Sequence, residues 1–425
     1  MQSFDDERFS RLTAMVEYPA AAVQKARVVV GGVGALGNEV VKNLCLLGFR
    51  NLFLIDMDTV ERSNLTRSVL FTETDLGKAK IHAAATAARR IYPEVRISGH
   101  FGDVATVGFG VFRRADLIFS DFDGFYPRIF LNAAALKVKK PWIDAALGVD
   151  PRRGSVMLYN ATRPDTACFV CRIGVQTAIE ELLEIEGLIG CQQLDRDRVA
   201  AGFMPTSPTT SAAIAAVQTQ AGLDLLRLGL SDDNLWTRSG MALNLGTLSA
   251  AKLKLQRMDG CPEHAGDRGI DAGSFLEAAT WQSHRTTIGQ AFNEVREFLA
   301  LRAAEPLYLS YHTLFKGLAH CLDCSATAAI FKPVYVVEAR KKRGIPVECP
   351  HCGSPNLEAD DDFGEISAVE QREFPRPDLT LAAAGFRRLD ILKFFALRDD
   401  RELICHAEIT GDQEQVFQPL VQGSS

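Results

Sequence analysis

The chain has 425 residues, 47% of them hydrophobic and 24% charged, and its 47 basic and 53 acidic side chains give a formal net charge of −6. This globular composition has room for two or three domains, and its evenly spread acidity argues against nucleic-acid binding, which favours a basic face. No apolar run reaches the roughly 18 residues of a membrane span, and the first residues lack the features of an export signal, so the sequence predicts a cytoplasmic protein with no membrane partner.

The first predicted unit is a strand, a turn, a helix and a second strand between Ala26 and Asp56. Arg27–Val30 and Asn51–Ile55 are short apolar runs typical of buried strands, and apolar residues recur at helical spacing between them. Short apolar runs alternate with helical patterns as far as Ser155, and the alanine-rich stretch Thr209–Leu228 predicts a buried helix. Such alternation is typical of a doubly wound, Rossmann-like α/β sheet.

The turn in this unit carries a nucleotide-binding pattern. Gly32, Gly34 and Gly37 fit G-x-G-x-x-G after a strand and before a helix, and Asp56 follows 19 positions after the last glycine. In such a loop, free N–H groups at a helix N-terminus bind phosphate, and the acidic residue accepts from a ribose hydroxyl. The pattern alone fits NAD as well as ATP, and it also fits a tight turn without a ligand.

Six of the ten cysteines form three C-x-x-C pairs, which in a chain without an export signal favour zinc or redox sites over disulfides. The pair Cys321 and Cys324 is separated by 24 intervening residues from the pair Cys349 and Cys352, the double-knuckle spacing of a structural zinc ribbon. The Gly- and Asp-rich stretch from His264 to Ser274 predicts a domain boundary. A smaller α+β domain over 270–425 is expected to contain the ribbon, a helix from Ile288 and a hairpin turning at Asp399 and Asp400.

Three further segments resemble the nucleotide site of the ThiF/MoeB and ubiquitin-activating enzyme superfamily. They are LIDMDTVERSNLTRSVLF from Leu54, GKAK from Gly77 and DLIFSDFDGFYPRIFLNAA from Asp116. The resemblance extends over about residues 5–265 and implies an adenylation domain over 1–265 that binds ATP and Mg²⁺. Ala35 and Ser68 depart from the family pattern, which usually has glycine and glutamine there.

The resemblance also implies roles for individual residues. Asp56 would hold the ribose, Asp123 would bind Mg²⁺, and Arg11 would reach into the ATP site of a second copy in a homodimer. The triphosphate would be surrounded by Asp58, Asn64, Arg67 and Lys80. A second structural zinc is expected on Cys168, Cys171, Cys261 and His264, which gives two Zn²⁺ per chain.

Three cysteines remain outside the predicted zinc sites. Cys45 and Cys405 are expected in the core, whereas Cys191 lies in a polar crossover over residues 172–208. In the resembled family this crossover carries the cysteine that accepts the activated carrier as a thioester, and nearby arginines would favour the thiolate. A loop cysteine without function is the alternative.

The resulting hypothesis is an ATP-dependent activating enzyme for a ubiquitin-like protein. It would adenylate the C-terminal glycine of that protein, form a thioester on Cys191 and pass the acyl group to a conjugating enzyme. The additional C-terminal domain resembles those of bacterial ubiquitin-like (ISG-type) conjugation operons, which suggests antiphage defence. The alternatives are a sulfur-carrier adenylyltransferase of the thiamine or molybdopterin type, a nicotinamide-dependent oxidoreductase, and a zinc-ribbon interaction protein.

Overall fold

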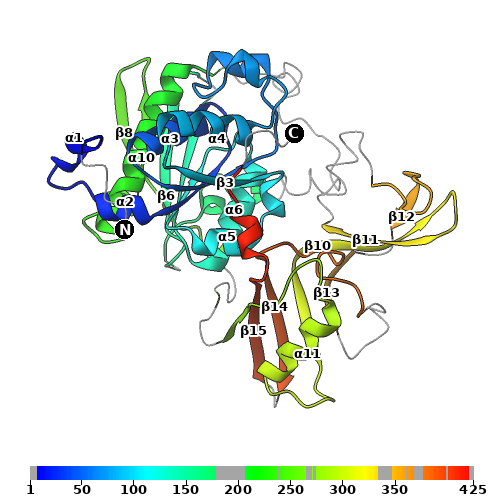
Figure 1. Ribbon diagram of the computed structural model, residues 1–425. Helices are drawn as coiled ribbons and strands as arrows, with labels where there is room; N and C mark the ends of the chain where they lie inside the picture. The colour runs from blue at the N-terminus through cyan, green and yellow to red at the C-terminus, as the bar shows by residue number, and fades with distance from the viewer. Residues whose placement is uncertain are drawn as a thin grey trace.

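The computed structural model describes residues 7–148, 150–163, 165–178, 206–237, 239–264, 270, 274–333, 347–359, 362–367, 377–398 and 401–420. In these residues the chain forms two β-sheets, a large one near the N-terminus and a smaller one formed by the C-terminal third (Figure 1). In the described part of the chain, no helix combines the length and the apolar character needed to cross a membrane.

The large sheet has the strand order β3-β2-β1-β4-β5-β6-β7-β8. The first five strands in this order are parallel, as the predicted α/β alternation requires, whereas β6, β7 and β8 pair antiparallel. The turn between β5 and β6 is too short for the crossover that parallel pairing requires, and this accounts for the reversal. The strands are β1 (Arg27–Gly31), β2 (Asn51–Asp56), β3 (Arg96–Phe101), β4 (Leu117–Ser120), β5 (Trp142–Leu147), β6 (Arg153–Tyr159), β7 (Ser239–Asn244) and β8 (Ser249–Lys254).

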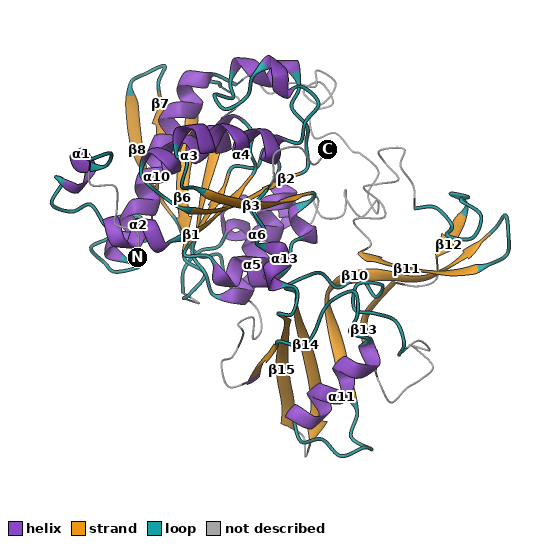
Figure 2. Ribbon diagram, in the orientation of Figure 1, coloured by secondary structure: helices purple, strands orange, loops and turns teal. Residues whose placement is uncertain are grey.

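Helices cover both faces of this sheet (Figure 2). One face packs against α3 (Ala35–Leu46), α4 (Lys80–Ile91) and α10 (Pro208–Leu228), and the predicted alanine-rich helix is thereby confirmed as a core element. The other face packs against α5 (Phe109–Arg114) and α6 (Phe125–Val138). The shorter helices are α1 (Ser10–Thr13), α2 (Ala20–Lys25), η1 (Arg62–Thr66), η2 (Glu73–Asp75), η3 (Val104–Thr106), α7 (Phe169–Ile173), η4 (Pro262–His264) and α13 (Gln413–Val416).

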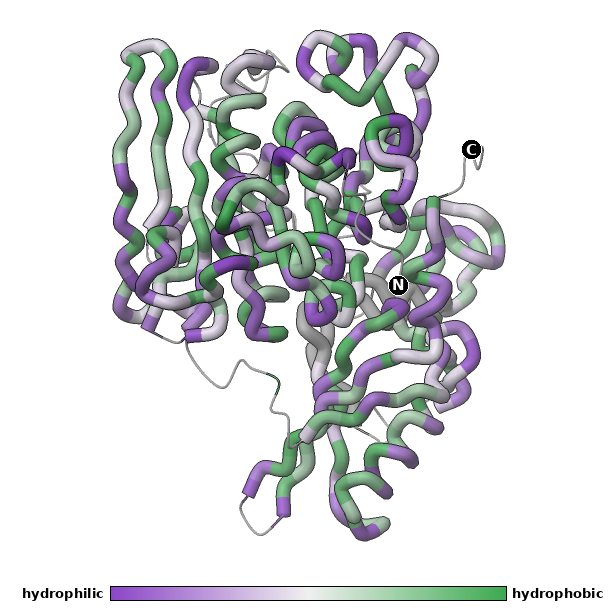
Figure 3. The backbone as a smooth tube through the Cα atoms, turned by 60° about the vertical axis from the view of Figure 1, so that its left-hand side comes forward, coloured by the Kyte–Doolittle hydropathy of each residue, from purple (hydrophilic) through white to green (hydrophobic). Residues whose placement is uncertain are grey.

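The smaller sheet has the path β11-β10-β14-β15-β9, with β12 and β13 also paired to β10. Its core lies under α11 (Ile288–Phe298). Each turn of this helix carries both hydrophobic and hydrophilic residues (Figure 3). Arg398 pairs with Arg401, which confirms the predicted hairpin. The strands are β9 (Phe275–Ala278), β10 (Leu307–Cys321), β11 (Thr327–Pro333), β12 (Leu357–Ala359), β13 (Asp362–Ser367), β14 (Ile391–Arg398) and β15 (Arg401–Ile409).

A buried ionic contact joins the two sheets. The carboxylate of Glu408 on β15 is fully buried and pairs with both Arg113 and Arg114 of α5. Two glycines allow the backbones to meet there, since a Cβ on Gly110 would lie 2.0 Å from a Glu408 oxygen, and one on Gly108 would lie 2.2 Å from a backbone oxygen. The smaller sheet therefore docks on the α5 side of the large one.

Candidate active site

The glycine loop lies between β1 and α3, at the carboxyl edge of the parallel strands. Gly32 has φ +85°, and a Cβ there would lie 2.7 Å from the backbone oxygen of Asp121, while a Cβ on Gly37 would lie 2.0 Å from the oxygen of Gly32. Gly34 faces open space and caps α3 without a side chain. The first N–H groups of α3 are therefore presented as in other anion-binding helix termini.

Gly37→Ala is expected to destabilise the protein by about 1–3 kcal/mol and to abolish nucleotide binding, because the new methyl group forces the loop away from α3. Gly34→Ala is the matched control, since its Cβ would enter open space and leave stability unchanged. Urea unfolding and fluorescent-ATP titration of both variants would test this. Equal free energies of unfolding of the two variants would contradict the close packing of the loop.

Asp56 ends β2 directly beside this loop and is only 8% exposed. Its two oxygens accept the N–H groups of Val33, at 2.6 Å, and of Asp58, at 2.8 Å. Burial raises the pKa of Asp56, while Lys80 and the two N–H donors oppose the shift. The carboxylate is thus fixed in place beside the glycine loop.

Asp58 and Lys80 are brought together although 22 positions separate them. The loop between them folds back as a short ladder, and Lys80 Nζ lies 2.8 Å from a carboxylate oxygen of Asp58. The lysine side chain is 12% exposed and opens α4, whereas the Asp58 side chain is 61% exposed. The structure therefore holds the Lys80 ammonium at the N-terminal end of α4, at the edge of the sheet that carries the glycine loop.

The other residues predicted for the triphosphate occupy the intervening loop. Asn64 is buried, and its side-chain oxygen accepts from the N–H of Glu61 as part of a capping box of η1. Arg67 ends η1, and its guanidinium donates to the backbone oxygen of Ser63 at 2.5 Å. Both side chains thus stabilise the conformation of the loop, and both also place polar groups on it.

Asp123 lies in the exposed loop between β4 and α6, two residues after the buried Asp121. Sequence reasoning assigned the first of these and missed the second. In the described part of the chain, neither carboxylate oxygen of Asp121 has a hydrogen-bond partner, and burial together with the charge of Asp144 raises its pKa well above the usual range. Asp121 thus lies directly under the glycine loop, where burial favours its neutral form.

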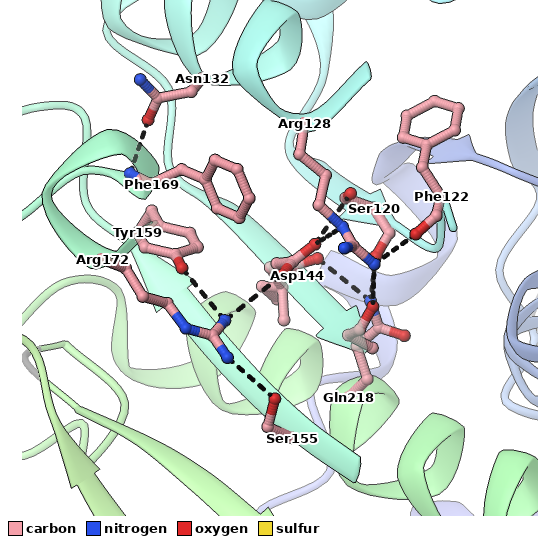
Figure 4. A network of polar contacts seen from close by, with 12 residues as sticks. Ser120, Phe122, Arg128, Asn132, Asp144, Ser155, Tyr159, Phe169, Arg172 and Gln218 are labelled. Carbon is pink, nitrogen blue, oxygen red and sulfur yellow. Dashed lines mark hydrogen bonds and ion pairs between the residues drawn. The ribbon is translucent and has the colours of Figure 1, made fainter. Parts of the chain in front are cut away.

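Asp144 on β5 forms the centre of a buried polar network beneath this edge (Figure 4). It pairs with Arg128 at 3.0 Å and Arg172 at 3.6 Å, and it accepts from Ser120 at 3.0 Å. Gln218 of α10 donates to the backbone oxygens of Ser120, the last residue of β4, and Ile143, the second residue of β5. The network ties α6, α7 and α10 to the strand ends that carry the site.

Asp121→Asn is expected to remove a pH-dependent loss of stability. Because the native pKa is raised, the native state keeps a proton that the unfolded chain releases, so wild-type stability falls as the pH rises above about 4. At pH 8 the variant should exceed the wild type by more than about 1 kcal/mol, and near pH 4 the two should coincide. Urea unfolding at both pH values measures this, with the exposed Asp123→Asn as control.

The first cysteine cluster joins α7 to η4. Cys168 Sγ lies 3.7 Å from Cys171 Sγ and 3.8 Å from Cys261 Sγ, and with His264 all four ligand atoms lie within 4.8 Å of one another. Sulfurs bound at 2.3 Å to a tetrahedral zinc lie about 3.8 Å apart, whereas a disulfide needs about 2 Å. The geometry therefore fits a closed Cys₃His zinc site and not a disulfide.

The second cluster lies at the far end of β10. Sγ distances of 3.6 Å between Cys321 and Cys352 and of 3.7 Å between Cys324 and Cys349 again match the edges of a zinc tetrahedron. Each pair sits in the same kind of turn, in which the N–H four residues after the first cysteine donates back to that cysteine's carbonyl. Four thiolates fit a structural Zn²⁺.

One predicted residue that the structure describes, Arg11, is not brought to this site within the chain. Arg11 is exposed on α1, which packs through Phe9 against Tyr92 at the C-terminal end of α4, whereas Lys80 opens that helix about 18 Å away. Cys191 lies outside the described residues. Cys45 and Cys405 are buried, as predicted.

Relatives of known function match part of the chain. It is 32% identical to SUMO-activating enzyme subunit 2 of Dictyostelium discoideum over 39% of this chain and 25% of that protein. It is 31% identical to the NEDD8-activating enzyme E1 catalytic subunit of Saccharomyces cerevisiae over 35% and 51%, and 28% identical to ubiquitin-like modifier-activating enzyme 5 of Drosophila ananassae over 47% and 55%. The matches span a quarter to about half of these relatives.

The solved structures that are similar to this chain include E. coli MccB, with a TM-score of 0.49 and 21% identity over 64% of this chain and 75% of that chain. PaaA has a TM-score of 0.47 and 19% identity over 61% and 76%. The model of the ThiF family matches residues 10–262, more than half of the chain. The chain therefore belongs to the ThiF family.

Proposed function

We propose that this protein is an ATP-dependent adenylyltransferase that activates the C-terminal glycine of a ubiquitin-like protein. The observation that carries the proposal is the convergence of the glycine loop, Asp56 and the Asp58–Lys80 pair at one edge of the parallel sheet. Similarity to three activating enzymes of ubiquitin-like modifiers supports the substrate class. A redox enzyme would need none of the charges around Lys80.

In the proposed reaction, an oxygen of the carrier's terminal carboxylate attacks the α-phosphorus of ATP. A carbon–oxygen–phosphorus bridge forms and the bond to pyrophosphate breaks, so the products are an acyl-adenylate and pyrophosphate. Asp56 would accept from the ribose, and Lys80 and Arg67 would stabilise the negative charge that grows on the phosphate oxygens. Asn64 and Asp58 would position these cations.

The exposed carboxylate of Asp123 is a ligand of the type that Mg²⁺ prefers, on a loop that continues from the strand end touching Gly32. Mg²⁺ bound there would supply positive charge to the phosphates. The two cysteine clusters would hold structural Zn²⁺, one within the proposed adenylation domain (1–265) and one in the proposed C-terminal domain (270–425). The C-terminal domain would recruit the carrier or a conjugating enzyme.

We further assign the thioester step to Cys191 and propose a homodimer in which Arg11 serves the second copy's site. Arg11 follows Phe9, which packs against Tyr92 at the end of α4 opposite to Lys80, and this placement supports a role in trans. The acyl group would pass from the adenylate to the Cys191 sulfur, releasing AMP, and then to a conjugating enzyme.

The test has two readouts. ATP–pyrophosphate exchange that depends on a ubiquitin-like protein ending in glycine would support adenylation, and tight NADH binding without exchange would refute it. A thiol-sensitive adduct on a non-reducing gel should appear with wild type and with Cys405→Ala, whose thiol is buried, but not with Cys191→Ala. Normal pyrophosphate exchange without a thiol-sensitive adduct in wild type would mean that the reaction stops at the acyl-adenylate.

A further inference from the structure

A cavity of about 350 Å³ lies at the amino edge of the large sheet, opposite to the glycine loop. It is bounded by the first residues of β1, β2 and β3, by the end of α5 and by Phe417 and Pro419 of the C-terminal segment. The Phe417 ring meets Phe53 edge-on at 5.7 Å, and the N–H of Leu420 donates to the oxygen of Ile97. The C-terminal segment thus closes one side of the cavity against the sheet.

The parallel register of β1, β2 and β3 arranges the residues that line this cavity in two rows. Arg27 pairs with Asn51 and Asn51 with Arg96, so these three side chains lie side by side on one face at the edge. In the next row inward on that face, Val29 pairs with Phe53 and Phe53 with Ser98. The cavity therefore has a polar, cationic rim and a mainly apolar floor.

The rim of the cavity carries more basic side chains than are paired with acidic side chains of the protein. Its charged lining residues are Lys25, Arg27, Arg96 and Arg114, and no acidic residue lines the cavity. Arg114 is held by Glu408, and Arg27 lies 3.8 Å from Asp116. Within the described residues, no ion pair or hydrogen bond involves the side chains of Lys25 and Arg96. Two cations at the rim are thus left for an external anion.

We propose that this cavity is a binding site for a small amphipathic organic anion, a carboxylate or phosphate ester on an apolar body. Its volume falls in the range of small-molecule sites, which combine an apolar lining with a few polar anchors. The two cations without an internal partner, Lys25 and Arg96, are the anchors for the anionic head, which the planar Arg96 guanidinium recognises by paired hydrogen bonds. The apolar body lies over Phe53 and Phe417.

The probes are 2-naphthoate, its neutral analogue 2-naphthamide and 2-naphthyl phosphate, titrated calorimetrically into the full chain. We expect one site per chain and at least tenfold tighter binding of naphthoate than of naphthamide. Tighter binding of the phosphate than of naphthoate would support a phosphate ester as the ligand head, and the reverse order would support a carboxylate. Equal affinity of the charged and neutral probes would overturn the proposal.

Arg96→Glu is expected to weaken naphthoate binding at least tenfold. The matched control is Arg90→Glu, an equally exposed arginine on α4 outside the cavity, which should change affinity less than twofold. Ser98→Phe should fill the floor and abolish binding, and if it fails to fold, Arg96→Gln decides in its place. Unchanged binding in the Arg96 variants would refute the site.

Each titration is repeated with saturating ATP, which is expected to leave naphthoate affinity unchanged because the nucleotide loop lies at the opposite edge of the sheet. Displacement of naphthoate by ATP would place the probe in the nucleotide site and overturn the assignment. This outcome is separate from the proposed adenylation, which pyrophosphate exchange reports independently.

Discussion

Lys80→Ala should lower carrier-dependent ATP–pyrophosphate exchange by about 10²–10³-fold, the loss seen when one charge-stabilising donor is removed from an active site. The ammonium group is largely buried, at 12% side-chain exposure, and is aligned by Asp58 at 2.8 Å, so little reorganisation precedes the reaction. We expect the main loss in kcat, because the charge on the phosphate oxygens grows as pyrophosphate departs.

Lys78→Ala provides the control for this prediction. Lys78 lies two residues away in the same loop, is 56% exposed and pairs with Asp75 at 3.1 Å. It should retain nearly wild-type exchange, because an exposed ion pair contributes little. If both variants lost activity equally, the loop as a whole and not the Lys80 charge would be responsible.

Cys171→Ser should remove one of the two proposed zinc ions and destabilise the proposed adenylation domain. Zinc contributes on the order of 10 kcal/mol to folding in small metal domains, comparable with the whole stability of a typical domain. The cluster ties α7 to η4, and Asn132 of α6 accepts from the N–H of Phe169 beside it. We therefore expect half the zinc content by atomic absorption, a lower Tm and reduced exchange.

Cys324→Ser is the counterpart at the second cluster. It should also halve the zinc content, but adenylation should persist, since this cluster lies at the end of β10 in the smaller sheet and the nucleotide loop belongs to the large sheet. Transfer to a conjugating enzyme is the step expected to suffer. Full zinc content in both variants would show that the clusters are thiol groups without metal.

Local pattern was sufficient to predict much of the large sheet. The strands at Arg27 and Asn51, the intervening helix and the alanine-rich helix form as expected, because apolar spacing and turn glycines act within a few residues. The second cysteine cluster was predictable from its double-knuckle spacing, since ligand spacing is set by the metal. The first cluster joins Cys168 and Cys171 to Cys261 and His264 in a distant segment, and it was expected only from the family resemblance.

The buried charges were not predictable in the same way. In the stretch SDFDG, the sequence does not show which aspartate faces the core, and the structure buries Asp121 and exposes Asp123. The burial of Asp144 between Arg128 and Arg172 depends on three segments that meet only in the folded chain. The antiparallel pairing of β6 was missed because apolar runs look alike in either direction.

The 15-residue strand β10 has a mechanical consequence. It pairs with β14 near its start and ends at Cys321 in the second cysteine cluster, so one backbone of about 50 Å runs from the core of the smaller sheet to the cluster. A force applied at the cluster is therefore transmitted to the smaller sheet through hydrogen-bonded strands and not through a flexible linker. Binding at its tip would act as torque on the sheet clamped to α5 through Glu408.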